Sequence, residues 1–250
     1  MYSVVTETPG KGATAEELVM LYTRYHLAAE MAQGKDVLEV ACGPGMGLGL
    51  MARRANRLVG GDYDPLLLQM GRGHYGERVP LIRLDAHALP FGRASFDLVI
   101  LFEAVYYLRR AEIFLEEVRR VLRTRGVILL CSSNKERPGF LPSPFSTAYY
   151  SAAELRGLLT RHGFTVELHA AFPVRPVLRR NSRSAARWLA NGIRLSPDAR
   201  ALAKRILFGE TLSFPVEVGE GMAEAAALTP LCDDAGVSQF QVLYAIGRLQ

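Results

Sequence analysis

The sequence predicts an α/β protein with a doubly wound, mostly parallel sheet. Between residues 36 and 130, short apolar runs alternate with segments of helical spacing. Strands separated by helices of about 10–15 residues are typical of crossover units, which make parallel sheets, and such sheets carry helices on both faces. The length of 250 residues and the 49% apolar content suit a single domain with a full core.

Five strands and three helices are expected in this core. The strands are predicted at residues 37–40, 57–60, 79–84, 96–102 and 126–131, and the helices at 47–54, 65–74 and 111–122. Pro65 suits the first turn of the second helix. Ile113, Leu115 and Val118 lie on one side of the third, as in an amphipathic helix.

The remainder of the chain is expected to flank this core. A capping box from Ser151 to Glu154 predicts a helix to about residue 161, followed by a strand at 164–168. Residues 16–33 have helical spacing and precede the first strand, so they could fold over a site as a lid lined by Tyr22, Tyr25 and His26. We therefore divide the chain into a lid (1–35), a core (36–171), a helical insertion that forms an acceptor subdomain (172–236) and a last strand (237–250).

A glycine turn follows the first strand and indicates a ligand site. Gly43 and Gly45 allow a ligand to approach the backbone closely, and the next helix offers free N–H groups at its N-terminus. Glu39, near the end of the strand, would repel a phosphate but suits a ligand that carries an ammonium group.

Two further strand ends carry acidic residues. Asp62 ends the second strand, where a carboxylate can accept both hydroxyls of a ribose. Asp85 ends the third strand, where it can accept an adenine amino group while the N–H of Ala86 serves a ring nitrogen. Because the carboxyl ends of parallel strands meet at one edge, Glu39, Asp62 and Asp85 fit a ligand with ammonium, ribose and adenine parts.

These segments resemble the class I S-adenosylmethionine-dependent methyltransferases, of the type-11-like small-molecule group. The matching segments, in the family's order and spacing, are VLEVACGPG (37–45), GGDYD (60–64), DAHALPF (85–91), SFDLV (95–99) and VLRTRGVILL (121–130). The resemblance covers residues 36–170. It implies a Rossmann-like sheet of seven strands with an antiparallel last strand, and S-adenosyl-L-methionine as cofactor.

The resemblance also implies which residues bind the cofactor. It places Glu39 near the methionine amino group, Asp62 at the ribose, Asp85 with Ala86 at the adenine, and Phe102 beside the cofactor. The complete expected set is Tyr22, Glu39, Ala41, Gly43, Gly45, Asp62, Tyr63, Asp85, Ala86 and Phe102.

Two positions depart from the family pattern. Ala41 stands where relatives often have glycine, and Tyr106-Tyr107 stands where many have Glu-His. The acceptor chemistry therefore has to be read from this chain.

Methyl transfer is an in-line displacement that depends mainly on positioning, and an oxygen or nitrogen acceptor can also need a base. The candidates are Glu103, Tyr106, Tyr107 and His87, with the tyrosines as orienting groups because tyrosine is a poor base at neutral pH. The alternatives are a loop-capping role for His87 and core packing for the tyrosines.

The net charge of +5 is concentrated in one region. Residues 173–210 hold nine basic and two acidic residues, so the other residues together are slightly acidic. This segment is interpreted either as a solvated helical face or as a wall that attracts anionic acceptors, with contact to a membrane surface through Trp188 as a further alternative. Nucleic acid is disfavoured as a partner because ordered interleaving of aromatic residues is absent.

Residues 134–150 and the composition of the chain bear on the expected acceptor and cellular compartment. Residues 134–150 are similar to a segment of methyltransferases from bacterial saccharide and natural-product pathways, which favours a small-molecule acceptor. Three scattered cysteines argue against a zinc site and a disulfide framework, and favour the cytoplasm. The sequence predicts neither a signal peptide nor a membrane span, since no run approaches about 20 apolar residues.

Two other functions remain as alternatives. A nicotinamide-dependent oxidoreductase also uses a glycine turn and a later acidic residue. It is disfavoured because Leu48 stands where its third glycine is required, and Glu39 would lie near the pyrophosphate. A non-catalytic scaffold that acts through residues 173–235 is disfavoured by the presence of Glu39, Asp62 and Asp85.

Overall fold

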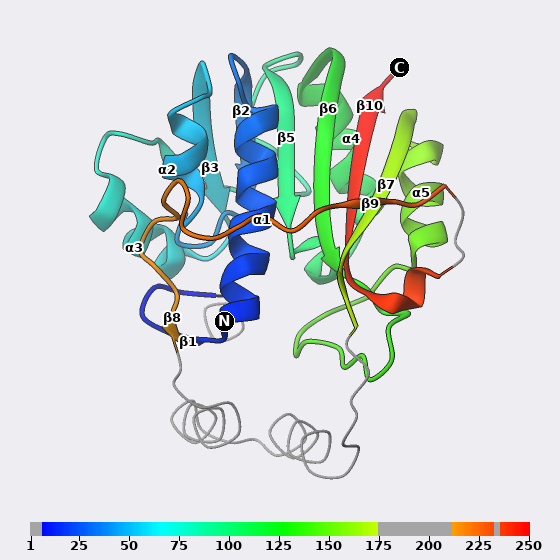
Figure 1. Cartoon of the computed structure of the whole chain (residues 1–250). Helices are drawn as coiled ribbons and strands as arrows, with labels where there is room; N and C mark the ends of the chain where they lie inside the picture. Colours follow the sequence, from blue (N-terminus) through cyan, green and yellow to red (C-terminus); the bar gives the residue numbers. More distant parts are fainter. Residues whose placement is uncertain (1–6, 175–211, 233–235) are drawn as a thin grey trace.

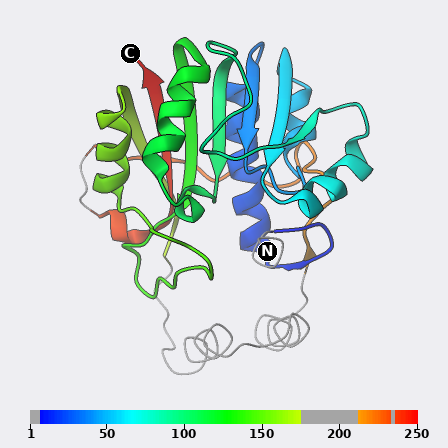
Figure 2. The ribbon, with the colours of Figure 1, turned by 180° about the vertical axis from the view of Figure 1, so that it is seen from behind.

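The computed structural model describes residues 7–174, 212–232 and 236–250. A sheet of eight strands in the order β4-β3-β2-β5-β6-β10-β7-β9 forms its centre, with helices on both faces (Figure 1; Figure 2). Its strands are β2 (Asp36–Val40), β3 (Arg57–Asp62), β4 (Leu81–Arg83), β5 (Phe96–Phe102), β6 (Leu122–Ser133), β7 (Phe164–Pro173), β9 (Thr229–Pro230) and β10 (Phe240–Leu249). The predicted doubly wound α/β fold is confirmed.

The helices pack against two hydrophobic layers. The side chains of β5 alternate between them, with Leu98 and Ile100 in one layer and Val99 and Leu101 in the other. The first layer is covered by α1 (Ala15–Met31) and α2 (Leu48–Ala52), and α3 (Pro65–Tyr75) contributes to it. The second is covered by α4 (Ala111–Val121) and α5 (Ala152–Arg161). The capping box at Ser151 is present at the start of α5.

The strand directions agree with the expected topology. β3, β2, β5 and β6 pair in parallel, and β4 pairs in parallel with β3. The last long strand, β10, inserts between β6 and β7 and is antiparallel to both. The seven expected strands are therefore present, and the two-residue β9 adds an eighth at the edge beside β7.

The insertion differs from the prediction in the part that the structure describes. A helical subdomain was expected over residues 172–236, but residues 212–232 contain no helix and consist of two short strands joined by turns and irregular segments. We call residues 212–232 the strap. It begins with β8 (Leu212–Ser213), which pairs with β1 (Gly12–Ala13), and then crosses in front of α1 to β9 (Figure 1). Backbone pairing and the buried side chains of Phe214 and Val218 hold it against the core. The basic segment 175–210 lies outside the described residues.

Helix α1 is a layer of the core along most of its length. Leu21 and Ala28 are fully buried in the layer between the helix and the sheet. A Thr14–Glu17 capping box begins the helix. Because this helix covers the sheet itself, only part of it remains available to cover a site.

Within the described residues, no helix is long and apolar enough to cross a membrane.

Candidate active site at the carboxyl edge of the sheet

A cavity of about 690 Å³ lies at the carboxyl ends of the parallel strands. Its walls come from the ends of β2, β3, β5 and β6 and from α1. Ligands of open α/β sheets bind outside the carboxyl ends of the strands, so the position agrees with the sequence prediction. Of the expected residues, the cavity is lined by Ala41, Gly43, Asp62, Tyr63, Asp85, Ala86, His87, Phe102, Glu103, Tyr106 and Tyr107.

The glycine turn is shaped by two close approaches. A Cβ at Gly47 would lie 1.9 Å from the ring of Tyr25, and a Cβ at Gly49 would lie 2.0 Å from a carboxylate oxygen of Glu217. Glycine at these positions therefore lets α1 and the strap contact the turn directly. Ala41, in contrast, adopts a φ of 57°, which is left-handed and favours glycine. Glycine would adopt this conformation without the steric cost that the Cβ of Ala41 imposes.

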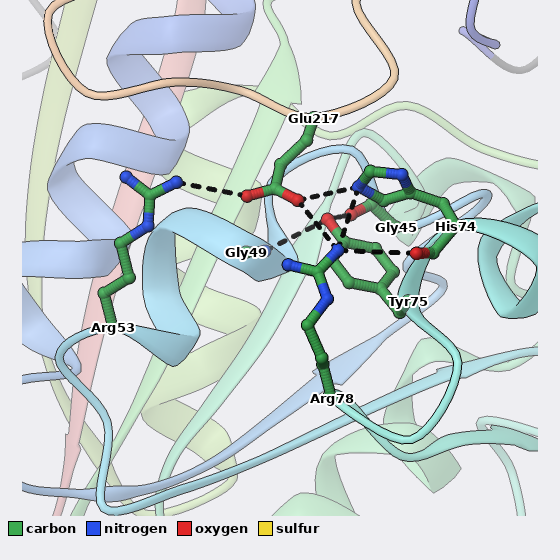
Figure 3. Close-up of polar contacts among 7 residues, drawn as sticks. All are labelled: Gly45, Gly49, Arg53, His74, Tyr75, Arg78 and Glu217. Atoms are coloured by element: carbon green, nitrogen blue, oxygen red, sulfur yellow. Dashed lines mark hydrogen bonds and ion pairs between the residues drawn. The ribbon is translucent and has the colours of Figure 1, made fainter.

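Tyr75 and the strap residue Glu217 contact the turn and the residues around it (Figure 3). The Tyr75 hydroxyl donates to the Gly45 carbonyl at 2.7 Å and accepts from the Gly49 N–H at 3.0 Å. The neighbouring Glu217 carboxylate pairs with His74 at 2.7 Å, Arg53 at 3.3 Å and Arg78 at 3.5 Å. The next strap residue, Val218, donates its N–H to the Met46 carbonyl at 2.7 Å. Sequence analysis missed Tyr75 and Glu217, because no local motif marks a contact between segments so far apart in the chain.

Glu39 is buried at the end of β2 and does not itself line the cavity. Its Oε1 accepts a 2.8 Å hydrogen bond from Tyr25, which does line the cavity. Its Oε2 is buried without a hydrogen-bond partner. Burial raises the pKa of Glu39 to about 8. A buried carboxylate oxygen without a partner is what an ammonium group would satisfy, so this residue fits the methionine end of S-adenosylmethionine.

Asp62 holds the backbone on both sides of the cavity. Its two oxygens accept the Gly43 N–H at 2.8 Å and the Asp64 N–H at 2.8 Å. Burial raises the pKa of its carboxyl group. The aromatic ring of Tyr63 is exposed beside it and lines the cavity. The pair offers a hydrogen-bond acceptor and a flat apolar surface, which suits a nucleoside.

Asp85 and His87 form one unit at the end of β4. The Asp85 Oδ1 accepts the His87 N–H at 2.9 Å and lies 2.7 Å from its Nδ1. The backbone hydrogen bond from His87 holds the pKa of Asp85 below its usual value. Asp85 is therefore a charged acceptor at this wall, and His87 has the loop-ordering contact that sequence analysis gave as its alternative.

Glu103 is a hydrogen-bonded carboxylate on the remaining wall of the cavity. It follows β5 with a φ of 48°, a left-handed conformation that is uncommon for a residue with a side chain. Its Oε2 accepts hydrogen bonds from the Tyr106 hydroxyl at 2.9 Å and the Ser133 hydroxyl at 3.0 Å. Burial raises the pKa of Tyr106, so its phenol stays protonated and donates.

Aromatic rings extend this wall into the loop after β6. Tyr106 stacks on Tyr149 with centroids 4.2 Å apart. The Tyr107 hydroxyl lies 2.6 Å from the Ser143 hydroxyl. The 134–150 loop thus contacts both candidate tyrosines.

Two predicted lid residues lie elsewhere. Tyr22 accepts the Gly221 N–H at 3.0 Å, so it holds the strap, and its ring stacks on His26. Neither residue is among those that line the cavity. Of the predicted lid, Tyr25 reaches the cavity, and Arg24, which the sequence did not single out, lies beside it.

Comparisons with known proteins agree with this geometry. Residues 38–130 match the family model of a methyltransferase domain. A protein of Mycolicibacterium smegmatis, described as a probable S-adenosylmethionine-dependent methyltransferase, is 38% identical over 149 residues, 57% of this chain and 57% of that protein. The chain spans about half the length of such curated relatives.

Solved structures share the fold over nearly the whole chain. A SAM-dependent methyltransferase from Archaeoglobus fulgidus superposes with a TM-score of 0.60 at 15% identity, covering 94% of this chain and 95% of that one. The [4+2]-cyclase SpnF gives 0.60 at 19% identity, with 99% and 90% covered. The sequence comparisons, the fold and the position of the cavity all indicate the same class of enzyme. The chain therefore carries a segment, residues 38–130, that matches the methyltransferase domain family, and it shares the fold of solved S-adenosylmethionine-dependent methyltransferases.

Proposed function

We propose that this chain methylates a small-molecule acceptor held against the wall formed by Glu103, Tyr106 and Tyr107. The observation that carries the proposal is the Glu103 carboxylate, which hydrogen bonds hold on the cavity wall. It follows β5, and its partner Tyr106 contacts the 134–150 loop. A base needs a fixed position relative to the proton that it removes. Hydrogen bonds from Tyr106 and Ser133 supply that position.

The remaining cavity residues would hold the cofactor. Tyr25, with Glu39 buried behind it, would face the ammonium group. Asp62 would face the ribose, Tyr63 a face of the adenine, and Asp85 its amino group. S-adenosylmethionine supplies a methyl group on a sulfonium, which is electrophilic without further activation. The role of the chain is then to hold the acceptor in line with that methyl group, which can contribute about 7–11 kcal/mol in favourable cases.

Glu103 would take the proton from an oxygen or nitrogen acceptor. S-adenosylmethionine would supply the methyl group to the acceptor atom and leave as S-adenosylhomocysteine, and Glu103 would take up the proton that the acceptor atom loses. Tyr106 and Ser133 keep the carboxylate oriented, and Tyr107 with Tyr149 would provide aromatic surface to the acceptor. The aromatic side chains of this wall favour acceptors with an apolar or ring-containing part, such as natural-product intermediates or saccharides, because such parts can pack against the rings.

The test separates cofactor binding from acceptor chemistry. Methyl-labelled S-adenosylmethionine is incubated with small-molecule extracts, and labelled products are identified by mass spectrometry. Glu103→Gln should lower the rate of label transfer by about 10²–10⁴-fold, while calorimetry should show unchanged affinity for S-adenosylhomocysteine. Glu112→Gln, a change on α4 at a residue that does not line the cavity, is the control.

Two results would reject the proposal. Full label transfer by Glu103→Gln would remove the base assignment. Binding of a nicotinamide cofactor without S-adenosylhomocysteine, or of neither, would favour the oxidoreductase or the scaffold instead.

A further inference from the structure

Arg24 is a buried cation on the wall of the cavity. The residue is 6% exposed, comes from α1 and lines the cavity beside Tyr25. Taking a guanidinium out of water is costly unless it is paired and its donors are satisfied. The Arg24 Nε is buried without a hydrogen-bond partner. The site therefore contains an incompletely satisfied positive charge.

The chain itself provides one carboxylate for this cation. The Arg24 Nη2 pairs with Glu7, whose side chain is 34% exposed and also lines the cavity. Burial by itself would lower the pKa of Arg24. The charge of Glu7 and other nearby groups outweighs burial and raises the pKa above its usual value, so the guanidinium stays charged. Among the described residues, Glu7 is the carboxylate in an ion pair with Arg24.

Two other acidic residues interact electrostatically with Arg24, namely Glu39, which accepts a hydrogen bond from Tyr25, and Glu103. Glu103 contributes to the field at Arg24, but its oxygens accept from Tyr106, Ser133 and Cys131. Glu7 is different because it meets Arg24 through one carboxylate oxygen, Oε2, and is partly open to solvent. A guanidinium can bind a carboxylate through two parallel hydrogen bonds. A ligand carboxylate could therefore replace Glu7 and use the unpartnered Nε as well.

We propose that Arg24 is the receptor for a ligand carboxylate and that Glu7 occupies it in the ligand-free protein. The carboxylate can come from the methionine end of the cofactor or from an acceptor that carries a carboxyl group. The second source rests on the proposed function. In both cases Glu7 competes with the ligand, so the apparent affinity is lower than the affinity of the open receptor.

The first experiment tests the cofactor as the source. Calorimetry compares S-adenosylhomocysteine with 5′-methylthioadenosine, which has the same nucleoside but no amino-acid part. With this source, Glu7→Gln should tighten S-adenosylhomocysteine binding by about tenfold, as expected for loss of one competing charged hydrogen bond, and leave 5′-methylthioadenosine unchanged. Arg24→Gln should weaken S-adenosylhomocysteine alone, and Arg24→Lys should restore part of the loss.

The second experiment tests the acceptor as the source. Butyrate is titrated into the complex with S-adenosylhomocysteine. If the acceptor supplies the carboxylate, Glu7→Gln should strengthen butyrate binding about tenfold and leave S-adenosylhomocysteine unchanged. Glu30→Gln is the control, since Glu30 is on the same helix as Arg24, is paired with His26 and does not line the cavity.

The outcomes decide the proposal. If Glu7→Gln alters neither S-adenosylhomocysteine nor butyrate binding, Arg24 is not a carboxylate receptor. Because Glu7→Gln retains the buried arginine, this result stands even if Arg24→Gln does not fold. Failure of label transfer with intact butyrate binding would reject the proposed function but not the receptor.

Discussion

The Tyr25 hydroxyl donates a 2.8 Å hydrogen bond to Glu39, and this contact joins the N-terminal helix to the first strand of the cofactor site. The same tyrosine ring fills the space that a side chain at Gly47 would need, and its edge meets Phe102 with centroids 5.4 Å apart. One aromatic residue therefore holds the acidic group, the glycine turn and the end of β5 in register.

Stability of the ligand-free protein should fall as pH rises through the titration of Glu39. Its pKa is about 8 in the folded state, whereas the pKa of an unperturbed glutamate is 4.5. Between those values the folded protein binds the proton that the unfolded chain has lost, so the free energy of unfolding decreases with rising pH, by up to about 1.4 kcal/mol per pH unit. Urea unfolding of the wild type and of Glu39→Gln from pH 5 to 8 measures this, and equal slopes would contradict it.

Ala41→Gly should be neutral or stabilising by up to about 1 kcal/mol. The left-handed φ of 57° at this position strains a residue with a Cβ, and relief of that strain opposes the extra entropy of glycine in the unfolded chain. Ala52→Gly in α2 is the control and should cost about 1 kcal/mol, since its backbone is helical. Chemical denaturation measures both, and similar losses for the two variants would refute the strain.

Gly49→Ala should displace Glu217 and loosen the cofactor turn. The new Cβ would lie 2.0 Å from the Glu217 Oε1, so the carboxylate has to leave its pairs with Arg53 and His74. We expect a higher KM for the cofactor with a smaller change in kcat, because we propose that the turn binds the cofactor and that the acceptor binds at the Glu103 wall. Gly73→Ala is the matched control, since nothing lies within 4 Å of its Cβ position. Equal effects of both changes on KM would exclude the steric explanation.

Tyr75→Phe should weaken cofactor binding through the turn. The hydroxyl bridges the Gly45 carbonyl and the Gly49 N–H, and its loss leaves two backbone groups without this partner. A lost buried hydrogen bond costs about 1–3 kcal/mol. The loss should appear as a lower melting temperature and a larger dissociation constant for S-adenosylhomocysteine. Unchanged affinity with lower stability would show that Tyr75 supports the fold only.

The sequence by itself determined the sheet, its helices and the position of the cofactor turn. These depend on local information, namely the alternation of apolar runs, the glycines after β2, and the acidic residues at the ends of β2, β3 and β4. The capping box of α5 was predicted for the same reason, since its partners Ser151 and Glu154 are three residues apart.

Only the tertiary structure decided which residues surround that turn. Glu217 meets His74 across 143 residues, and Tyr25 covers Glu39 instead of leaving it open to the cavity. It also showed that the described part of the expected helical insertion is a strap without a helix, and that Arg24 faces the cavity while Tyr22 holds the strap. Such contacts are fixed by packing between distant segments, where residue spacing along the chain carries no information.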